Sequence, residues 1–530
     1  MIQVTAFFFV LALCAAGATS APAPTSEKPT PLDPLTHAND IFNAIHSSMR
    51  QFGSSLNHNG LGFYIASVPQ DTEFYHGTSH EFRINGTEWL AFEAEHALLF
   101  ASMGLGRFPG GGPGGGPGRG PPPSIREQQE QIPFSSSTFS SVARSRHGFL
   151  HTYKTRRPLR LLYLDGQSAA KSDFGTLDTQ DLVIRKKSTA DPMPGGGEFE
   201  RAEDMCRIAQ ESWAGKIDGI LRMEGGFEII LCSFAEVLDV IDIKQVEAPG
   251  KFDHYAYYEA VASRYHGIGG GRVTLDYDSF VTMFALPNAT YIDEEGRPRM
   301  YADSEQVQIT RDLLHALALS GKTPEIDAIN WQAVVDMYVA RWSNRLEYLF
   351  TLVGEKKSFK EQLKMMRRPY IDFANRSREA EVGRCVHQFW PDSTRSSSAT
   401  KSVAAQAVHQ VVHKMCSSIW TAWDAIDDGD AQKAFDTATE LKSYLSWTTW
   451  KQCRGCQAHE ICKLPIWPMG SKEDFAQPQC TADFASDRGG YWGHGGPGGP
   501  GGPGGPGGPG GPGGPGGPGG HDGSGGSNWA

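Results

Sequence analysis

The chain has 530 residues, enough for two or three domains with sizeable cores. Acidic side chains outnumber basic ones by 60 to 49, and the formal net charge is −11. Nucleic acids and anionic membrane surfaces both need a basic face on their partner, so this balance argues against either as a main partner.

The N-terminus predicts export. Residues 6–16 form an apolar run of signal-peptide length, and a small-residue cleavage pattern follows it. We therefore assign 1–20 to a signal peptide and expect a secreted, extracellular protein. Loss of Cys14 leaves eight cysteines, an even number that suits disulfides in an exported chain. The Pro-, Ser- and Thr-rich residues 21–35 are expected to form a disordered leader.

Residues 36–248 carry the mixed patterns of an α+β domain. Helical spacing of apolar residues predicts helices over 94–102 and 200–213. A Glu-Gly-Gly turn at 224–226 predicts a hairpin between the last two strands. The segments with strand character are 62–66, 73–75, 89–92, 150–155, 159–164, 219–223 and 227–232.

A tract rich in Gly and Pro, residues 109–123, interrupts this domain and cannot bury a core. Strand patterns resume at Phe149, directly after the polar stretch that follows the tract. We therefore interpret 106–145 as a disordered insertion within one domain. Three sequons are compatible with glycosylation: Asn85, Asn288 and Asn375.

From residue 252 the patterns become mostly helical and remain so to about 450. The segments with helical periodicity are 253–265, 303–320, 329–353, 358–366, 400–426 and 431–445. A Cys-rich segment, 451–482, follows. The Gly-Gly-Pro repeats of 483–530 are too few for a stable collagen-like helix, and we expect a disordered or polyproline-II-like tail.

The cysteines of the Cys-rich segment have partial zinc-ligand spacing, but the secretory route favours oxidation. We expect two disulfides among these four, with a connectivity that spacing does not reveal. Cys206–Cys232 and Cys385–Cys416 are the remaining pairs that we predict. The four cysteines concerned are Cys453, Cys456, Cys462 and Cys480.

Two polar residues stand out in apolar strands. His76 ends a strand beside Gly77, and a glycine lets a ligand approach the backbone. Glu228 interrupts the run Phe227–Leu231, so it points away from its apolar neighbours. A carboxylate there is either solvated or directed into a cleft, where it could stabilise a developing cation.

The order of these segments resembles the ADP-ribosyltransferase fold of the His-Tyr-Glu type, which includes diphtheria-like toxins and poly-ADP-ribose polymerases. In that family a strand ending in His-Gly-Thr or His-Gly-Ser binds the nicotinamide end of NAD. Residues 73–78 match this strand, 89–101 resemble the second motif, and 227–231 resemble the strand of the catalytic glutamate. The resemblance implies an ADP-ribosyltransferase-like fold for 36–248.

The resemblance also implies roles. His76 would hold a ribose hydroxyl, and Glu228 would stabilise the oxocarbenium-like ribose as nicotinamide leaves, a charge logic shared with glycoside hydrolysis. NAD would be the substrate, water or an unknown partner would accept the ADP-ribose, and no metal is expected. The further cofactor-binding residues implied are Gly77, Thr78, Trp89 and Phe100.

One departure keeps a second function class open. Where the family often has a stacking tyrosine, this chain has Phe100, which lacks the hydroxyl. The alternative is a non-catalytic secreted or cell-wall interaction protein on a degenerate fold. Residues 447–474 are similar to the C-terminal region of secreted fungal proteins of unassigned function, a resemblance that supplies no activity.

Two other motifs are candidate ligand sites. His409 and His413 lie one helical turn apart and could chelate a metal, but Gln410 stands where zinc proteases have glutamate. A pair of interfacial helix histidines is the alternative. The glycine-rich stretch 267–272 has no Walker lysine after it and is better interpreted as a flexible turn.

Overall fold

The computed structural model describes most of the two central regions of the chain. The signal peptide, the leader up to residue 31, the 106–145 insertion and the 483–530 tail lie outside the described residues. The described residues are 32–57, 61–103, 148–169, 172, 174–187, 197–246, 254–262, 268, 271–302, 304–322, 328–391, 401–466 and 471–482.

A mixed ten-stranded sheet dominates the N-terminal region and confirms the α+β class. Its strand order is β10-β1-β5-β6-β7-β3-β2-β4-β8, and β9 also pairs with β1. The β5–β6 pair is parallel, and the other pairs of this sheet are antiparallel. The strands are β1 (Gly62–Val68), β2 (Glu73–Thr78), β3 (Glu88–Ala91), β4 (Phe149–Thr155), β5 (Leu159–Leu164), β6 (Gly219–Met223), β7 (Phe227–Leu231), β8 (Leu238–Gln245), β9 (Thr274–Leu275) and β10 (Val281–Thr282).

Every predicted strand is present, and the sheet is larger than the sequence indicated. Strand β5 is apolar at nearly every position and buried throughout, as a central strand requires. Strand β8 was missed because it lies at the sheet edge, where its mostly exposed residues carry no buried pattern. Strands β9 and β10 also join the sheet, which therefore continues beyond residue 248.

Helix α3 (Ala94–Met103) packs on β2 and β4 through two glycines. A Cβ on Gly77 would lie 1.7 Å from the Ala97 carbonyl oxygen, and a Cβ on Gly148 would lie 2.0 Å from that of Ala101. The helix backbone therefore rests directly on the strands. Gly77 is required for this packing, a role that differs from the ligand approach expected for it.

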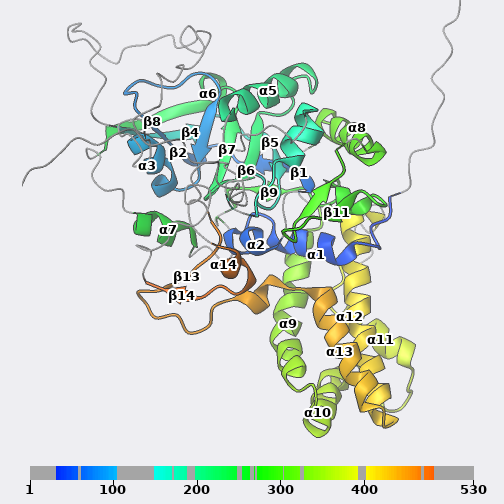
Figure 1. Ribbon diagram of the computed structural model, residues 1–530. Coiled ribbons are helices and arrows are strands. Elements are labelled where there is room, and N and C mark those ends of the chain that lie inside the picture. Colours follow the sequence, from blue (N-terminus) through cyan, green and yellow to red (C-terminus); the bar gives the residue numbers. More distant parts are fainter. Residues whose placement is uncertain are drawn as a thin grey trace, which may run out of the picture.

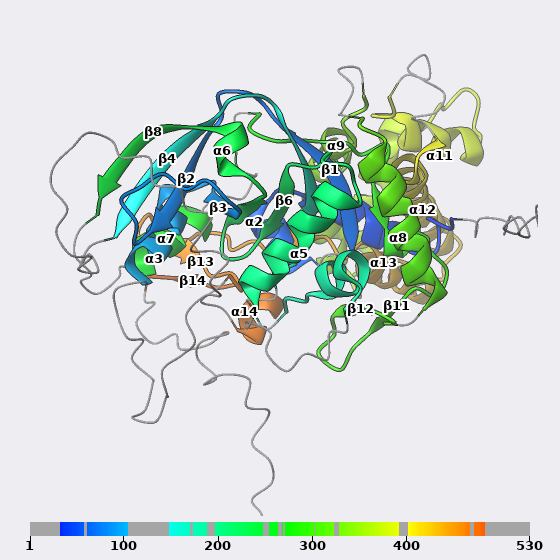
Figure 2. The ribbon, with the colours of Figure 1, turned by 90° about the horizontal axis from the view of Figure 1, so that it is seen from above.

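The helical region confirms the expected periodicity, and its helices between residues 331 and 445 gather beneath the sheet in Figure 1. Its helices are α8 (Glu305–Leu319), α9 (Trp331–Thr351), α10 (Lys356–Arg367), α11 (Arg378–His387), α12 (Val403–Asp427) and α13 (Ala431–Leu445). Of these, α11 was not predicted. Seen from above, β8, β4 and β2 lie at the end of the sheet away from α9, α12 and α13 (Figure 2).

Helix α1 (Ala38–Ser47) joins the two regions. It packs against α12 and α9, and Phe42 stacks on Trp447 with ring centroids 6.0 Å apart. One hydrophobic core runs from the sheet into the helices, so burial stabilises both regions together. The remaining helices are α2 (Gln51–Leu56), α5 (Glu198–Glu211), α6 (Phe234–Val237), α7 (His254–Ala262), α14 (Lys472–Ala476) and the short turns η1 (Thr179–Arg185), η2 (Met283–Ala285), η3 (Arg368–Tyr370) and η5 (Thr448–Lys451).

The eight cysteines from Cys206 to Cys480 all form disulfides, as predicted. The pairs are Cys206–Cys232, Cys385–Cys416, Cys453–Cys462 and Cys456–Cys480. Two short hairpins complete the fold: β11 (Thr290–Ile292) with β12 (Pro298–Met300), and β13 (Ile461–Cys462) with β14 (Cys480–Thr481). Within the described ranges, no helix combines the length and apolar character needed to span a bilayer.

Candidate functional site

A cavity of about 350 Å³ opens between α3, the start of α5 and four neighbouring strands, β2, β3, β7 and β6. This volume lies in the range of small-molecule sites. All the site residues expected from the sequence contribute to its wall: His76, Gly77, Thr78, Trp89, Phe100 and Glu228. The structure therefore brings together segments that are more than 150 positions apart in sequence.

Strand register explains how the cavity forms. Tyr75 pairs with Ala91, Ala91 with Glu228, and Glu228 with Arg222. Residues paired in this way present their side chains to the same face of a sheet. Ala91 is small, so the row has a gap between the larger side chains of Tyr75 and Glu228. That gap is where the cavity meets the sheet.

Glu228 is held from one side by a buried arginine. Its side chain is 1% exposed, and Arg222 Nε donates to its Oε1 over 2.8 Å. The same guanidinium donates to Gln180 Oε1 at 2.8 Å and to Glu198 Oε2 at 2.7 Å. Glu224 also lines the cavity, and Arg201 Nη1 donates to the other oxygen of Glu198 at 2.8 Å, so three carboxylates share two guanidinium groups.

This excess of negative charge governs protonation. Burial and the neighbouring Glu224 carboxyl raise the pKa of Glu228 well above its usual range, although Arg222 acts in the opposite direction. Burial disfavours the charge of Arg222, but Glu198, Glu228 and Glu224 together raise its pKa. Arg222 is therefore charged at neutral pH, and Glu228 takes up a proton more readily than a solvated glutamate does.

His76 lies in a different position from Glu228. It follows Tyr75 on β2, so strand alternation turns its side chain toward the other face. Strands β2 and β3 pair only at Tyr75 and Ala91. At the next residues along the two strands, the His76 side chain takes part instead, and its Nδ1 lies 2.8 Å from the Trp89 carbonyl oxygen. The ring also contacts Phe234 edge-on. The imidazole thus occupies the gap between the two strands, next to the cavity.

The contacts of His76 define its tautomer. A carbonyl oxygen only accepts, so Nδ1 carries the proton and donates it to Trp89, which leaves Nε2 as an acceptor. Burial lowers the pKa of His76 to about 4, so the ring is neutral at physiological pH. Nε2 is buried and has no hydrogen-bond partner within the described ranges. It is suited to accept a hydrogen bond from a ligand hydroxyl.

Aromatic side chains form much of the remaining wall. Trp89 meets Phe199, the second residue of α5, edge-on with centroids 4.9 Å apart. The ring centroid of Phe100 lies 5.7 Å from that of His96, which is one helical turn earlier on α3. Such faces bind planar ligand rings by stacking.

Sequence reasoning missed part of this wall. The missed residues include His96, Glu198, Phe199, Arg222 and Glu224. The signal for Arg222 was present, because the predicted Glu-Gly-Gly turn fixes a hairpin register with Arg222 opposite Glu228. For His96 the signal was its four-residue spacing from Phe100 on a predicted helix.

The other candidate motifs give weaker sites. The rings of His409 and His413 lie 6.1 Å apart and nearly parallel, with Trp390 edge-on to His409. Cys453, Cys456 and Cys480 lie close together, but their sulfurs are bonded in disulfides. The 267–272 stretch lies largely outside the described residues; its Arg272 donates to backbone oxygens of Glu73 and Phe92.

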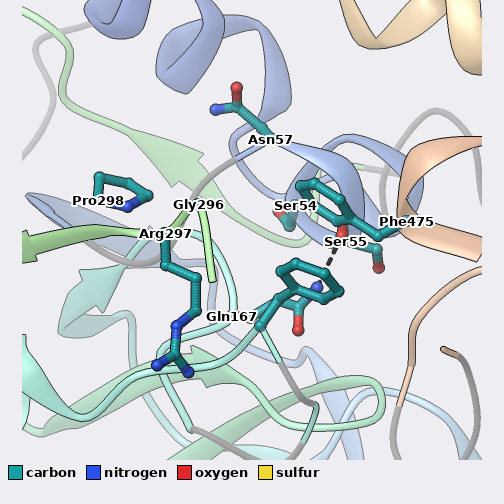
Figure 3. A pocket seen from close by; sticks show the side chains of 9 residues that line it. Ser54, Ser55, Asn57, Gln167, Gly296, Arg297, Pro298 and Phe475 are labelled. Carbon is teal, nitrogen blue, oxygen red and sulfur yellow. Dashed lines mark hydrogen bonds between the residues drawn. The ribbon is translucent and has the colours of Figure 1, made fainter. Parts of the chain in front are cut away.

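A second pocket, between α2, the β11–β12 hairpin and α14, is too small for an organic ligand (Figure 3). Its volume is about 10 Å³, roughly the space of one water molecule. Gln167 Nε2 donates to the Ser55 carbonyl oxygen at 2.7 Å, and Phe174 stacks on Phe475 with centroids 4.0 Å apart. These contacts indicate a packing junction.

Comparison with known proteins finds similarity in the sheet region. Residues 30–253 match the family described as the YPL277C N-terminal domain. The chain is 31% identical over 232 residues to uncharacterized protein YOR389W of Saccharomyces cerevisiae, and 33% identical over 232 residues to uncharacterized protein YPL277C of the same yeast. Each match covers 40% of this chain, with 34% and 44% of the respective relatives.

The chain therefore matches less than half the length of either yeast relative. No solved structure matches it. The matched part includes the strands and helices that build the cavity, so this region is homologous to the yeast proteins, whose names carry no function.

Proposed function

Because no activity comes with the yeast relatives, we propose one from the cavity: the protein is a secreted ADP-ribosyltransferase-like enzyme that cleaves the nicotinamide–ribose bond of NAD. One observation carries the proposal. Three residues from separate motifs, His76, Trp89 and Glu228, line a single cavity of ligand size. The four disulfides support export, since such bonds form in oxidising compartments.

The chemistry uses the negative charge of the cavity. When the bond from ribose C1′ to the ring nitrogen breaks, its electron pair goes to nicotinamide, which becomes neutral. The ribose becomes oxocarbenium-like, and water or an acceptor nucleophile attacks C1′ and then loses a proton. The Glu228 carboxylate stabilises the positive charge on the ribose, and Arg222 holds that carboxylate in place.

The positive charge of the nicotinamide ring in NAD also suits the negative charge of the cavity before the reaction begins. Glu198, Glu224 and Glu228 outnumber the two guanidinium groups that pair with them, Arg222 and Arg201, so a cationic ligand adds positive charge and favours ionised Glu228. His76 Nε2 would accept a hydrogen bond from a ribose hydroxyl. Trp89 and Phe100 offer faces for the ring, and the backbone at Gly77 and Thr78 would bind its carboxamide.

The test is nicotinamide release from NAD by the purified full-length chain. We expect Glu228→Gln to lower the rate by about 10²–10³-fold, the loss typical for one charge-stabilising group. Glu95→Gln is the matched control, because Glu95 is an exposed glutamate of α3 outside this cavity. Equal release by wild type and Glu228→Gln, or no release by wild type, would reject the proposal.

A non-catalytic binding protein is the second candidate, and two observations favour it. Arg222 already pairs with Glu228, and Phe100 offers no hydroxyl at the place of the family's tyrosine. This candidate predicts that the cavity binds a ligand without turnover. Calorimetric titration with NAD separates the two: binding with no nicotinamide release supports the second candidate.

A further inference from the structure

We propose that His96, Glu224 and Glu228 form a binding site for a divalent transition-metal ion, with Zn²⁺ as the best fit. The three residues come from α3, the β6–β7 turn and β7, and one ligand atom of each lies within 4.8 Å of the other two. Imidazole nitrogen with carboxylate oxygen is a ligand set that zinc accepts. This site departs from the expectation, stated above, that no metal takes part.

His96 is the strongest reason for the proposal. Its side chain is 0% exposed, and in the described part of the chain neither ring nitrogen has a hydrogen-bond partner. Its Nε2 lies 4.0 Å from Glu224 Oε2, toward the carboxylates. A buried polar group without a partner destabilises the fold. Coordination of a metal ion by Nε2 would give one of the two ring nitrogens a partner.

Charge and distance also fit a cation. Glu198, Glu224 and Glu228 supply up to three negative charges, against the two buried guanidinium groups of Arg222 and Arg201, and Arg201 is shared with a further carboxylate, Asp181. Ligand atoms around tetrahedral zinc lie about 3.4 Å apart, given bonds of about 2.1 Å. Atoms already within 4.8 Å of one another reach this spacing by small side-chain rotations. The fourth position would face the cavity.

The surroundings of His96 show a second carboxylate on its other side. A Cβ on Gly226 would lie 3.0 Å from His96 Nδ1 and 3.3 Å from Glu93 Oε2, so both atoms approach the same point. Metal-bound histidines commonly donate their second N–H to a carboxylate, which orients the ring. Glu93 is placed for this role, and Gly226 gives both side chains the room they need.

The experiment titrates chelator-treated full-length protein with Zn²⁺ by calorimetry and, in parallel, with Co²⁺ by visible spectroscopy. We expect one ion per chain and Co²⁺ bands typical of a site with few ligands. His96→Gln and Glu224→Gln should each weaken binding by 100-fold or more, and Glu93→Gln by about 10–100-fold. Mg²⁺, which prefers oxygen ligands, should not compete.

The control is the His409→Gln/His413→Gln variant, which removes the other histidine pair with chelating spacing. It should keep the ion that His96→Gln loses. Absence of stoichiometric binding, or loss of the ion in the control but not in His96→Gln, would overturn the proposal. If His96→Gln does not fold, paramagnetic NMR of the Co²⁺ form decides: one shifted imidazole supports the site, and two refute it.

This inference goes beyond the proposed function, because metal binding is measured without NAD. If both hold, the ion and the reacting ribose compete for Glu228, and Zn²⁺ inhibits nicotinamide release in wild type. Zinc binding without any NAD cleavage would reject the enzymatic proposal alone, and NAD cleavage without zinc binding would reject the metal site alone.

Discussion

Two glutamates, one in the helical region and one in the sheet region, are equally buried, but their surroundings shift their pKa values in opposite directions. Glu381 on α11 and Glu228 on β7 are both 1% exposed. Arg376 Nε donates to Glu381 at 2.6 Å and Trp420 Nε1 at 2.9 Å. Burial acts against its charge, but these contacts lower the pKa of Glu381, whereas the pKa of Glu228 is raised.

The surroundings of the two carboxyl groups distinguish a glutamate that stabilises the fold from one in a candidate functional site. Glu381 has donors on both oxygens and sits among packed helices. Glu228 has a donor on one side, a second carboxylate nearby and a cavity in front. Carboxyls with a strongly perturbed pKa in a cavity are candidates for chemistry, while fully satisfied ones stabilise a fold.

The largest expected effect tests this contrast directly. Glu381→Gln should lower the free energy of unfolding by about 3–5 kcal/mol, because it leaves buried Arg367 without its charge partner. Glu228→Gln should lower it by less, because Arg222 keeps Glu198 as a charge partner and the repulsion between Glu228 and Glu224 is relieved. Urea unfolding of both variants measures this, and equal losses would contradict the contrast.

Disulfides sharpen the same comparison. Cys206–Cys232 spans 26 residues and Cys385–Cys416 spans 31, so removal of either by paired Cys→Ala changes should cost about 3–4 kcal/mol. Only the first pair holds α5, which supplies Glu198 and Phe199 to the cavity. We expect nicotinamide release to fall in that variant and to persist in the other. The reverse pattern would place the site in the helical region.

His76 predicts a pH effect that belongs to the sheet region. The pKa of His76 is about 4 in the folded protein, against 6.5 for an ordinary histidine in the unfolded chain. Between these two pH values the unfolded chain therefore binds more protons than the folded protein does. Stability from neutral His76 is therefore complete above pH 6.5 and is lost as pH falls toward 4, by at most about 3 kcal/mol. Unfolding free energies at pH 7 and 4.5 should differ less in His76→Gln than in wild type. An unchanged difference would refute this assignment.

The smallest expected effect concerns Phe199, which is 54% exposed and contacts Trp89. Phe199→Ala should raise the KM for NAD by up to about tenfold, the value of one aromatic contact, and leave kcat and stability nearly unchanged. Tyr348→Ala, which removes a similarly exposed aromatic from α9, is the control. A matching KM change in the control would show that Phe199 has no specific role.

Much of the architecture was accessible from local patterns. The Glu-Gly-Gly turn and its apolar flanks predicted the β6–β7 hairpin, and the helical periodicity of 400–426 predicted α12. Cysteine count and export predicted that all eight would pair. Each of these follows from interactions between residues near in sequence or from one chemical rule.

Other features depend on contacts between distant segments and were not accessible. Burial of His96 against Glu224 requires α3 to fold back over the hairpin. The packing of Gly77 against the backbone of Ala97 likewise depends on where α3 lies, and it adds a structural role to the ligand binding that remains a prediction for this residue. The ADP-ribosyltransferase resemblance remains a proposal, supported by the shared cavity and by no matching structure.

The close contact of Gly148 with Ala101 has a consequence for how this chain can change. Helix α3 ends at Met103 and β4 begins at Phe149, so the chain leaves and re-enters the sheet at neighbouring points. Closing a loop between such fixed points costs only about 0.6 kcal/mol more for each doubling of its length. We therefore expect a change in the number of residues between Met103 and Gly148 to alter the free energy of unfolding by less than about 1 kcal/mol.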